Sequence, residues 1–159
     1  MATVRYALVT GTGRADTSLA AFDAALLDAG IGNWNLVTLT SILPPGAEEE
    51  DAPPPLPPGA IVPAVLARSV DRGPVASCVC VAHLESGFGI IAERSDASDP
   101  DRAEERALRD VEEMARARGE EIVEVKTATA FNEPEGDEWA AAVSAVVLWG
   151  RIPVGVPQG

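Results

Sequence analysis

The sequence predicts an α+β fold, in which antiparallel β-sheets form a sandwich with flanking helices, all within a single domain over residues 1–159. Seven segments have the composition of strands and two have the spacing of helices, a mixture that suits helices packed on antiparallel sheets. A length of 159 residues is typical of one hydrophobic core, and 47% of the residues are hydrophobic, which is enough to build it.

The first elements are a strand, a helix and a second strand. Residues 3–10 are β-branched and apolar, which predicts a strand, and the segment GTGRAD after them is typical of a turn. Asp16 or Thr17 can cap a helix through residues 18–29, and the glycine that follows would end it. A strand over residues 35–41 is expected next.

A proline-rich segment interrupts this pattern between residues 44 and 59. It contains seven prolines and four acidic residues. Proline has no amide donor, so the segment cannot form a helix or an interior strand, and we expect an exposed, extended loop. It is not a linker between domains, because the 43 residues before it are too few for an independent core.

The remaining chain predicts five strands around a second helix. The strands are expected over residues 60–68, 75–84, 87–93, 121–130 and 139–149. Ser98 or Asp99 can cap the helix, with Pro100 in its first position and Gly119 after its last turn. Helical spacing is kept by Ala103, Ala107, Val111, Met114 and Arg118.

The charge of the chain restricts its partners. The formal net charge is −13, so the protein would repel nucleic acid and anionic membranes, and it would attract cationic ligands. A pyridoxal enzyme needs a Schiff-base lysine, and the single lysine, Lys126, lies in an alternating segment typical of an ordinary strand. We therefore expect no pyridoxal cofactor. No metal is expected either, because Cys78 and Cys80 would need further ligands and the sequence has a single histidine.

The location of the protein is expected to be cytoplasmic. No run of about 18 apolar residues predicts a membrane span. The first eleven residues also lack the layout of a secretory signal, because Arg5 interrupts their apolar run.

Three short motifs favour structural roles. Gly11 and Gly13 invite a dinucleotide-binding interpretation, but the third glycine is missing and Asp16 would repel a pyrophosphate. Cys78 and Cys80 would share one face of a strand, where we expect buried free thiols. The histidine of the sequence, His83, stands near no nucleophile elbow, which argues against a catalytic triad.

One long segment carries a functional signal. Residues 21–47, AFDAALLDAGIGNWNLVTLTSILPPGA, run through helix, glycine-asparagine turn, strand, Thr-Ser pair, isoleucine and two prolines. This order resembles the precursor motif of pyruvoyl-dependent arginine decarboxylases. The resemblance continues more loosely through the proline-rich segment, the strand at 87–93, the acidic helix and WAAAVSAVVLWG.

The resemblance implies self-cleavage between residues 40 and 41 into chains 1–40 and 41–159. Attack of Ser41 Oγ on the Thr40 carbonyl would make an ester, and elimination with loss of ammonia would leave a covalent pyruvoyl group derived from Ser41. We expect Thr40 and Ser41 to end a strand at a proline-stiffened turn, where backbone strain could be held. The family often has serine where Thr40 stands, but threonine presents the same carbonyl.

The resemblance also implies two further catalytic residues. Glu93 matches the catalytic glutamate of the family, and its small and apolar neighbours would raise the pKa of its carboxyl, which suits a general acid. Asn35 matches an asparagine six residues before the pyruvoyl serine. In an unbulged strand this separation would place Asn35 and Ser41 on one face.

Substrate binding is implied for four more residues. Asp23 matches the guanidinium-binding aspartate, because a carboxylate accepts two parallel hydrogen bonds from that group. It lies close in angle to the predicted apolar stripe, which consists of Leu19, Phe22, Leu26 and Ala29. Leu19, Gly32 and Trp34 match positions that line the pocket in the family.

The predicted function is the conversion of L-arginine to agmatine and CO2. The family assembles as trimers, sometimes doubled, so the resemblance implies a homotrimer or a dimer of trimers, with sites between protomers. Two alternatives remain open: the same chemistry on another amino acid, and a non-cleaving, non-catalytic homologue that acts as a binding protein.

Overall fold

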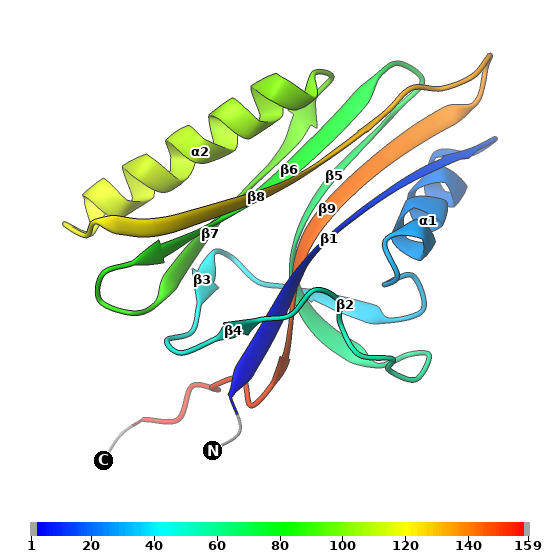
Figure 1. Ribbon diagram of the computed structural model, residues 1–159. Coiled ribbons are helices and arrows are strands. Elements are labelled where there is room, and N and C mark those ends of the chain that lie inside the picture. Colours follow the sequence, from blue (N-terminus) through cyan, green and yellow to red (C-terminus); the bar gives the residue numbers. More distant parts are fainter. Residues whose placement is uncertain (1–2, 158–159) are drawn as a thin grey trace.

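The fold consists of four layers, two helices on the outside and two β-sheets between them (Figure 1). The computed structural model describes residues 3–157, apart from the side chains of residues 96 and 97. Helix α1 (Ser18–Asp28) covers one sheet, and helix α2 (Pro100–Ala117) covers the other. This arrangement confirms the predicted α+β sandwich with flanking helices.

The sheet under α1 has five strands. Their order is β2 (Asn35–Thr38), β5 (Ile61–Asp71), β9 (Trp139–Gly150), β1 (Val4–Ala15) and β4 (Glu48–Glu49). The three long strands pair antiparallel, whereas the two short edge strands, β2 and β4, pair parallel with their neighbours.

The sheet under α2 has four strands and is antiparallel throughout. Their order is β3 (Ile42–Leu43), β7 (Gly89–Ala97), β6 (Val75–Leu84) and β8 (Ile122–Asn132). The described chain therefore contains nine strands, two more than the sequence predicts. The additional strands, β3 and β4, are only two residues long and lie in the segment expected to be turn and loop.

The segment GTGRA is not the predicted turn but the second half of β1, which pairs with β9 as far as Ala15. The glycines are needed because α1 crosses this strand closely. A Cβ on Gly11 would lie 2.1 Å from the carbonyl oxygen of Ala25, and a Cβ on Gly13 would lie 2.5 Å from that of Ala21. The glycines therefore serve helix packing, and the segment forms no loop.

Helix α1 buries most of the predicted stripe, but Leu19 lies outside the buried face. Thr17 caps its first turn by accepting a hydrogen bond from the amide of Ala20 at 3.1 Å. The residues buried against the sheet are the small Ala21, Ala25 and Ala29, with Phe22 and Leu26 half-buried beside them. Leu19, predicted to face the core, is 74% exposed. The close approach to Gly11 and Gly13 selects alanines for the contact.

Helix α2 follows its prediction. Asp99 caps it by accepting from the amides of Asp101 and Arg102, and Pro100 occupies the first position. Its buried side chains are Ala103, Ala107, Val111 and Ala115, and Gly119 beyond its end has a φ of 66°.

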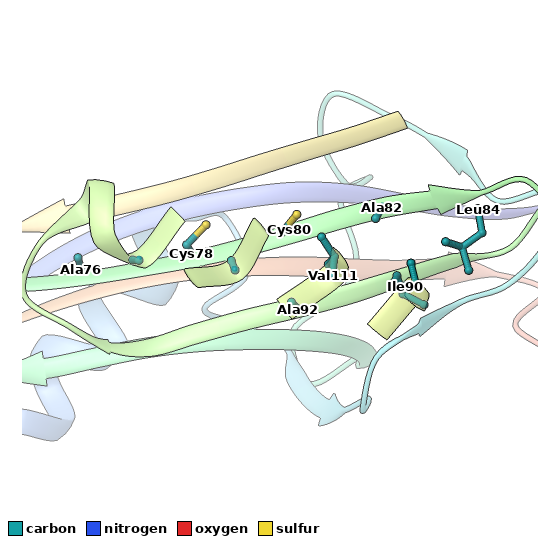
Figure 2. Close-up of a cluster of buried hydrophobic side chains, with 11 residues drawn as sticks. Ala76, Cys78, Cys80, Ala82, Leu84, Ile90, Ala92 and Val111 are labelled. Carbon is teal, nitrogen blue, oxygen red and sulfur yellow. The ribbon is translucent and has the colours of Figure 1, made fainter. Parts of the chain in front are cut away.

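The layer between α2 and its sheet is closely packed and apolar. Figure 2 shows Cys78 and Cys80 on one side of β6, with Val111 of α2 in the same buried cluster. Both thiols are free and buried, as predicted, and burial raises the pKa of Cys80 to about 12. The thiols therefore stay protonated near neutral pH, and neither is an activated nucleophile.

No helix within residues 3–157 combines the length and the apolar composition needed to cross a membrane.

Candidate active site

The Thr40–Ser41 pair lies where the chain crosses from one sheet to the other. The amide of Leu39 donates to the carbonyl oxygen of Ala64 in β5 at 2.9 Å, in the five-stranded sheet. Two residues later, the carbonyl oxygen of Ser41 accepts from the amide of Ile91 in β7 at 2.7 Å, in the four-stranded sheet. Thr40 is exposed and Ser41 is half-buried, so the bond between them is held at both sides and remains accessible.

The strand before this pair is shorter than predicted. β2 ends at Thr38, so the strand alternation that would place Asn35 and Ser41 on one face does not reach Ser41. The expected strain is not present as an unusual φ either, because glycine is the only residue type with positive φ in the described chain. The tertiary crossover, rather than a strained turn, distinguishes this site.

The early end of β2 leaves an open sheet edge beside the crossover. β2 pairs with β5 over Ile61–Ala64 alone, and beyond that point the edge of β5 faces β7. A hollow of about 470 Å³ lies there. It is lined by Thr38, Leu66, Arg68, Glu93 and Ser95.

Glu93 lies in this hollow, on the strand that binds Ser41. It follows Ile91 by two residues, so both side chains are on the same side of β7, about 7 Å apart along the strand. Partial burial of the carboxyl raises the pKa of Glu93 above its usual value. A carboxyl of this kind holds its proton to higher pH, as a general acid requires.

The neighbouring cation is directed away from Glu93. Arg94 donates from Nε and Nη2 to the two carboxylate oxygens of Asp110 in α2, both at 2.7 Å. The alternation of β7 therefore separates two roles: Arg94 joins the strand to its helix, and Glu93 faces the hollow.

Asn35 lies at the start of β2 and is exposed. Its Nδ2 donates to the carbonyl oxygen of Gly59 at 3.1 Å, which joins the strand to the end of the proline-rich segment. An amide nitrogen has two N–H groups, so this bond leaves one donor available.

Asp23 lies on the outer face of α1, not beside its buried stripe. Leu19, Asp23 and Leu27 follow one another at four-residue spacing and therefore share a face, on which the two leucines are 74% and 51% exposed. Leu19 also lines a second hollow, together with Phe22 and Arg68. A carboxylate between two exposed leucines suits a ligand with an aliphatic stem and a cationic end.

Gly32 and Trp34 lie in a third hollow, between the end of α1 and the proline-rich segment. It is lined by Leu27, Gly30, Gly32, Asn33, Trp34, Leu56 and the prolines 53, 54, 55 and 58. The indole Nε1 of Trp34 donates to the carbonyl oxygen of Leu56 at 3.3 Å. A Cβ on Gly32 would lie 2.7 Å from the amide nitrogen of Leu27, so glycine permits this packing.

His83 lines none of these three hollows and has a structural role. Its Nε2 and the Tyr6 hydroxyl form a hydrogen bond of 2.9 Å between the two sheets. Burial, with Glu49 and Glu124 nearby, raises the pKa of Tyr6 to about 12, so the phenol stays neutral. This is the structural role that the sequence favours for His83.

Within one chain, the eight predicted site residues are distributed over separate surfaces. Glu93 and the crossover share one region, and Asp23 and Leu19 lie on α1, with Leu27 linking α1 to the hollow of Trp34. Arg68 lines both the hollow of Glu93 and that of Leu19, and it was not predicted as a site residue. A charged residue inside the apolar run IVPAVLARSV was the available signal.

The half-buried Ser41, with its carbonyl fixed on β7 and Glu93 farther along the same strand, fits the formation of a pyruvoyl group at this position. Known proteins provide an independent comparison. The family model described as pyruvoyl-dependent arginine decarboxylase matches residues 5–152.

Three relatives carry that same name, pyruvoyl-dependent arginine decarboxylase. The one from Methanopyrus kandleri is 65% identical over 146 residues, which cover 92% of this chain and 97% of the relative. The one from Methanothermobacter thermautotrophicus is 37% identical over 147 residues, covering 91% and 95%. The one from Pyrococcus furiosus is 38% identical over 138 residues, covering 84% and 87%. The chain therefore belongs to the pyruvoyl-dependent arginine decarboxylase family.

Proposed function

We propose that this protein cleaves itself between Thr40 and Ser41 and then converts L-arginine to agmatine and CO2. The observation that carries the proposal is the position of the pair at the crossover, where Ser41 is bound to the strand that also holds Glu93. Family membership and the carboxylate on the outer face of α1 support arginine as the substrate.

Cleavage uses the atoms of the pair itself. Ser41 Oγ attacks the Thr40 carbonyl carbon, the C–N bond breaks, and the nitrogen of residue 41 takes up the hydroxyl proton, giving an ester. Loss of the Cα proton expels the Thr40 carboxylate and leaves dehydroalanine at residue 41. Water then replaces its nitrogen, which departs as ammonia, and the new N-terminus is a pyruvoyl group.

Both products of cleavage would stay in one fold. Chain 1–40 contains β1, α1 and β2, and β1 pairs with β9 along its whole length. Arg5 also forms ion pairs with Glu48 and Glu50 from the other chain. Separation would expose the core between α1 and the five-stranded sheet, which opposes dissociation.

Once formed at residue 41, the pyruvoyl group would supply an electron-accepting ketone for the decarboxylation. The residues of the chain do the rest. Glu93 delivers its proton to the substrate Cα after decarboxylation, since the raised pKa keeps that proton available. The second N–H of Asn35 donates to a carbonyl oxygen as negative charge develops there.

Arginine is bound through its distal end. The guanidinium donates two parallel hydrogen bonds to Asp23, and its methylene groups lie along the exposed leucines of α1. Gly32 and Trp34 provide an adjoining wall.

The complete site is formed between protomers of a homotrimer, alone or doubled. Two observations support this: the site residues occupy separate hollows in one chain, and large apolar side chains around them are exposed. These side chains are Leu19, Leu27, Val37, Ile42 and Ile61.

The intact mass of freshly purified protein under denaturing conditions tests the proposal. We expect one fragment ending at Thr40 and another starting at residue 41 that is lighter than a serine start by one ammonia. Ser41→Ala should give a single chain. Release of CO2 from labelled arginine by the cleaved protein then tests the substrate.

Each alternative gives its own result. A wild-type chain that stays intact after long incubation would favour the non-catalytic homologue. A cleaved protein that decarboxylates another amino acid, but not arginine, would retain the chemistry and reject the substrate.

A further inference from the structure

Arg68 lies between two of the hollows described above. Its side chain extends from β5 and lines both the hollow of Glu93 and that of Leu19. The guanidinium carbon is 4.8 Å from the centre of the Phe22 ring, so the aromatic face of α1 holds the cation in place. The amide of Arg68 donates to Ser95 Oγ at 3.3 Å, which fixes the backbone against β7.

The surroundings of Arg68 differ from those of four other arginines in this chain. Arg5, Arg14, Arg94 and Arg116 each form an ion pair with a carboxylate of the same chain. Among the side chains described within residues 3–157, those of residues 96 and 97 excepted, no carboxylate forms such an ion pair with Arg68, whose cation lies on an aromatic ring instead. A guanidinium held in this way keeps its hydrogen-bond donors available to an anionic ligand.

We propose that Arg68 binds the α-carboxylate of the amino-acid substrate, an inference that rests on the proposed function. Glu93 must reach the substrate Cα to protonate it, and the carboxylate is attached to that same carbon. Arg68 lines the hollow that contains Glu93 and is the one cationic residue among the five that line it. The fork of a guanidinium matches a carboxylate in two parallel hydrogen bonds.

Binding of the α-carboxylate by Arg68 would distinguish the substrate from the product. The carboxylate is present in arginine and absent from agmatine, so Arg68 favours binding of the substrate over the amine that the reaction releases. The interaction is strongest before CO2 departs, and it therefore assists binding without assisting the chemical step.

The test compares Arg68→Met with the wild-type protein, using KM for arginine and the inhibition constant of agmatine. We expect KM to rise about 10- to 100-fold, the range for lost hydrogen bonds to a charged group, while kcat stays the same or rises. The inhibition constant of agmatine should change by less than about twofold. The KM of Arg68→Lys should lie between those of the wild-type protein and Arg68→Met, because lysine retains the charge but not the forked pair of donors.

Arg72→Met is the matched control. Arg72 lies over the ring of Trp139 at 5.0 Å, so this variant removes the same charge and the same kind of contact away from the hollow of Glu93. The KM for arginine and the inhibition constant of agmatine should both stay at the wild-type values. The Lys variant preserves the test if Arg68→Met folds poorly.

Three results would overturn the inference: an unchanged KM, a parallel rise in KM and in the agmatine constant, or a fall in kcat alone. Failure of the proposed function has other signatures. An uncleaved chain is seen by mass before any variant of Arg68 is made, and it would reject both proposals. If another amino acid proves to be the substrate, the same comparison applies to that amino acid and its amine.

Discussion

The two helices have similar inner faces and different outer faces. Each packs alanines against its sheet, Ala21 and Ala25 in α1 and Ala103 and Ala107 in α2. On the outside, α2 carries charged side chains, whereas α1 exposes Leu19 and Leu27 with Asp23 between them.

Several polar side chains of α2 have partners within the chain. Arg94 binds Asp110, Thr127 Oγ1 donates to Glu104 at 3.0 Å, and Arg116 pairs with Glu113. Helix α2 is thus completed by its own sheet and by solvent, whereas α1 presents apolar surface that suits a ligand or a second protomer. The proposed site thus lies on the side of the molecule whose exposed apolar surface is not covered within one chain.

Glu93→Gln should have the largest effect on activity, because Glu93 faces the hollow on that side and is the proposed general acid. We expect kcat to fall by about 10²- to 10⁴-fold, the usual contribution of a general acid. Because its pKa is raised, Glu93 keeps its proton to a higher pH than an ordinary glutamate, and the wild-type rate should decline as pH rises through that pKa. A pH–rate profile checks this, and the declining limb should be missing from the variant.

Asp110→Asn is the control on the α2 side of the same strand. It weakens the bond to Arg94 and should lower the melting temperature while leaving the declining limb of the pH profile in place. Loss of the declining limb in Asp110→Asn as well would contradict the distinction between the two faces of β7.

Asp23→Asn should reduce kcat/KM for arginine by about 10- to 100-fold, because one neutral amide replaces a carboxylate that accepts from guanidinium. Glu113→Gln on α2 removes the same charge from an exposed helix position and should leave kcat/KM unchanged. Equal effects of the two variants would indicate a general influence of net charge rather than a binding site on α1.

Val111→Ala should lower the free energy of unfolding by about 2 kcal/mol, because Val111 is fully buried against β6 and β7 and its removal leaves a cavity. Leu27→Ala should act through assembly instead, so its effect on the melting temperature should depend on protein concentration. Thermal unfolding at two concentrations measures both. A concentration-independent loss in Leu27→Ala would contradict an association surface on α1.

Removal of the helix caps should have the smallest effect on stability, and the effect should be similar for α1 and α2. Thr17→Ala and Asp99→Ala each remove an oxygen that accepts from first-turn amides, and each should cost about 1 kcal/mol in denaturant unfolding. A much larger loss at Thr17 would mean that α1 depends on its cap more than on its packing.

Local features of the fold were predictable because they depend on neighbouring residues. The cap and proline of α2 and the spacing of its buried residues predict its start and its inner face correctly. In α1 the predicted stripe is right except for Leu19, which is exposed, and it omits Ala21 and Ala25, the alanines that the sheet contact selects. The selection depends on Gly11 and Gly13, which allow only a close contact with small side chains.

The sequence by itself determined the α+β class, both helix starts, the buried cysteine pair and the Thr40–Ser41 motif. Tertiary structure alone decided that GTGRA is a strand, that the chain changes sheets at Ser41, and that Arg68 lies beside Glu93. The physical reason is range. Caps, strand alternation and motifs act over a few residues, whereas a sheet edge and the hollow beside it are made by strands far apart in the chain.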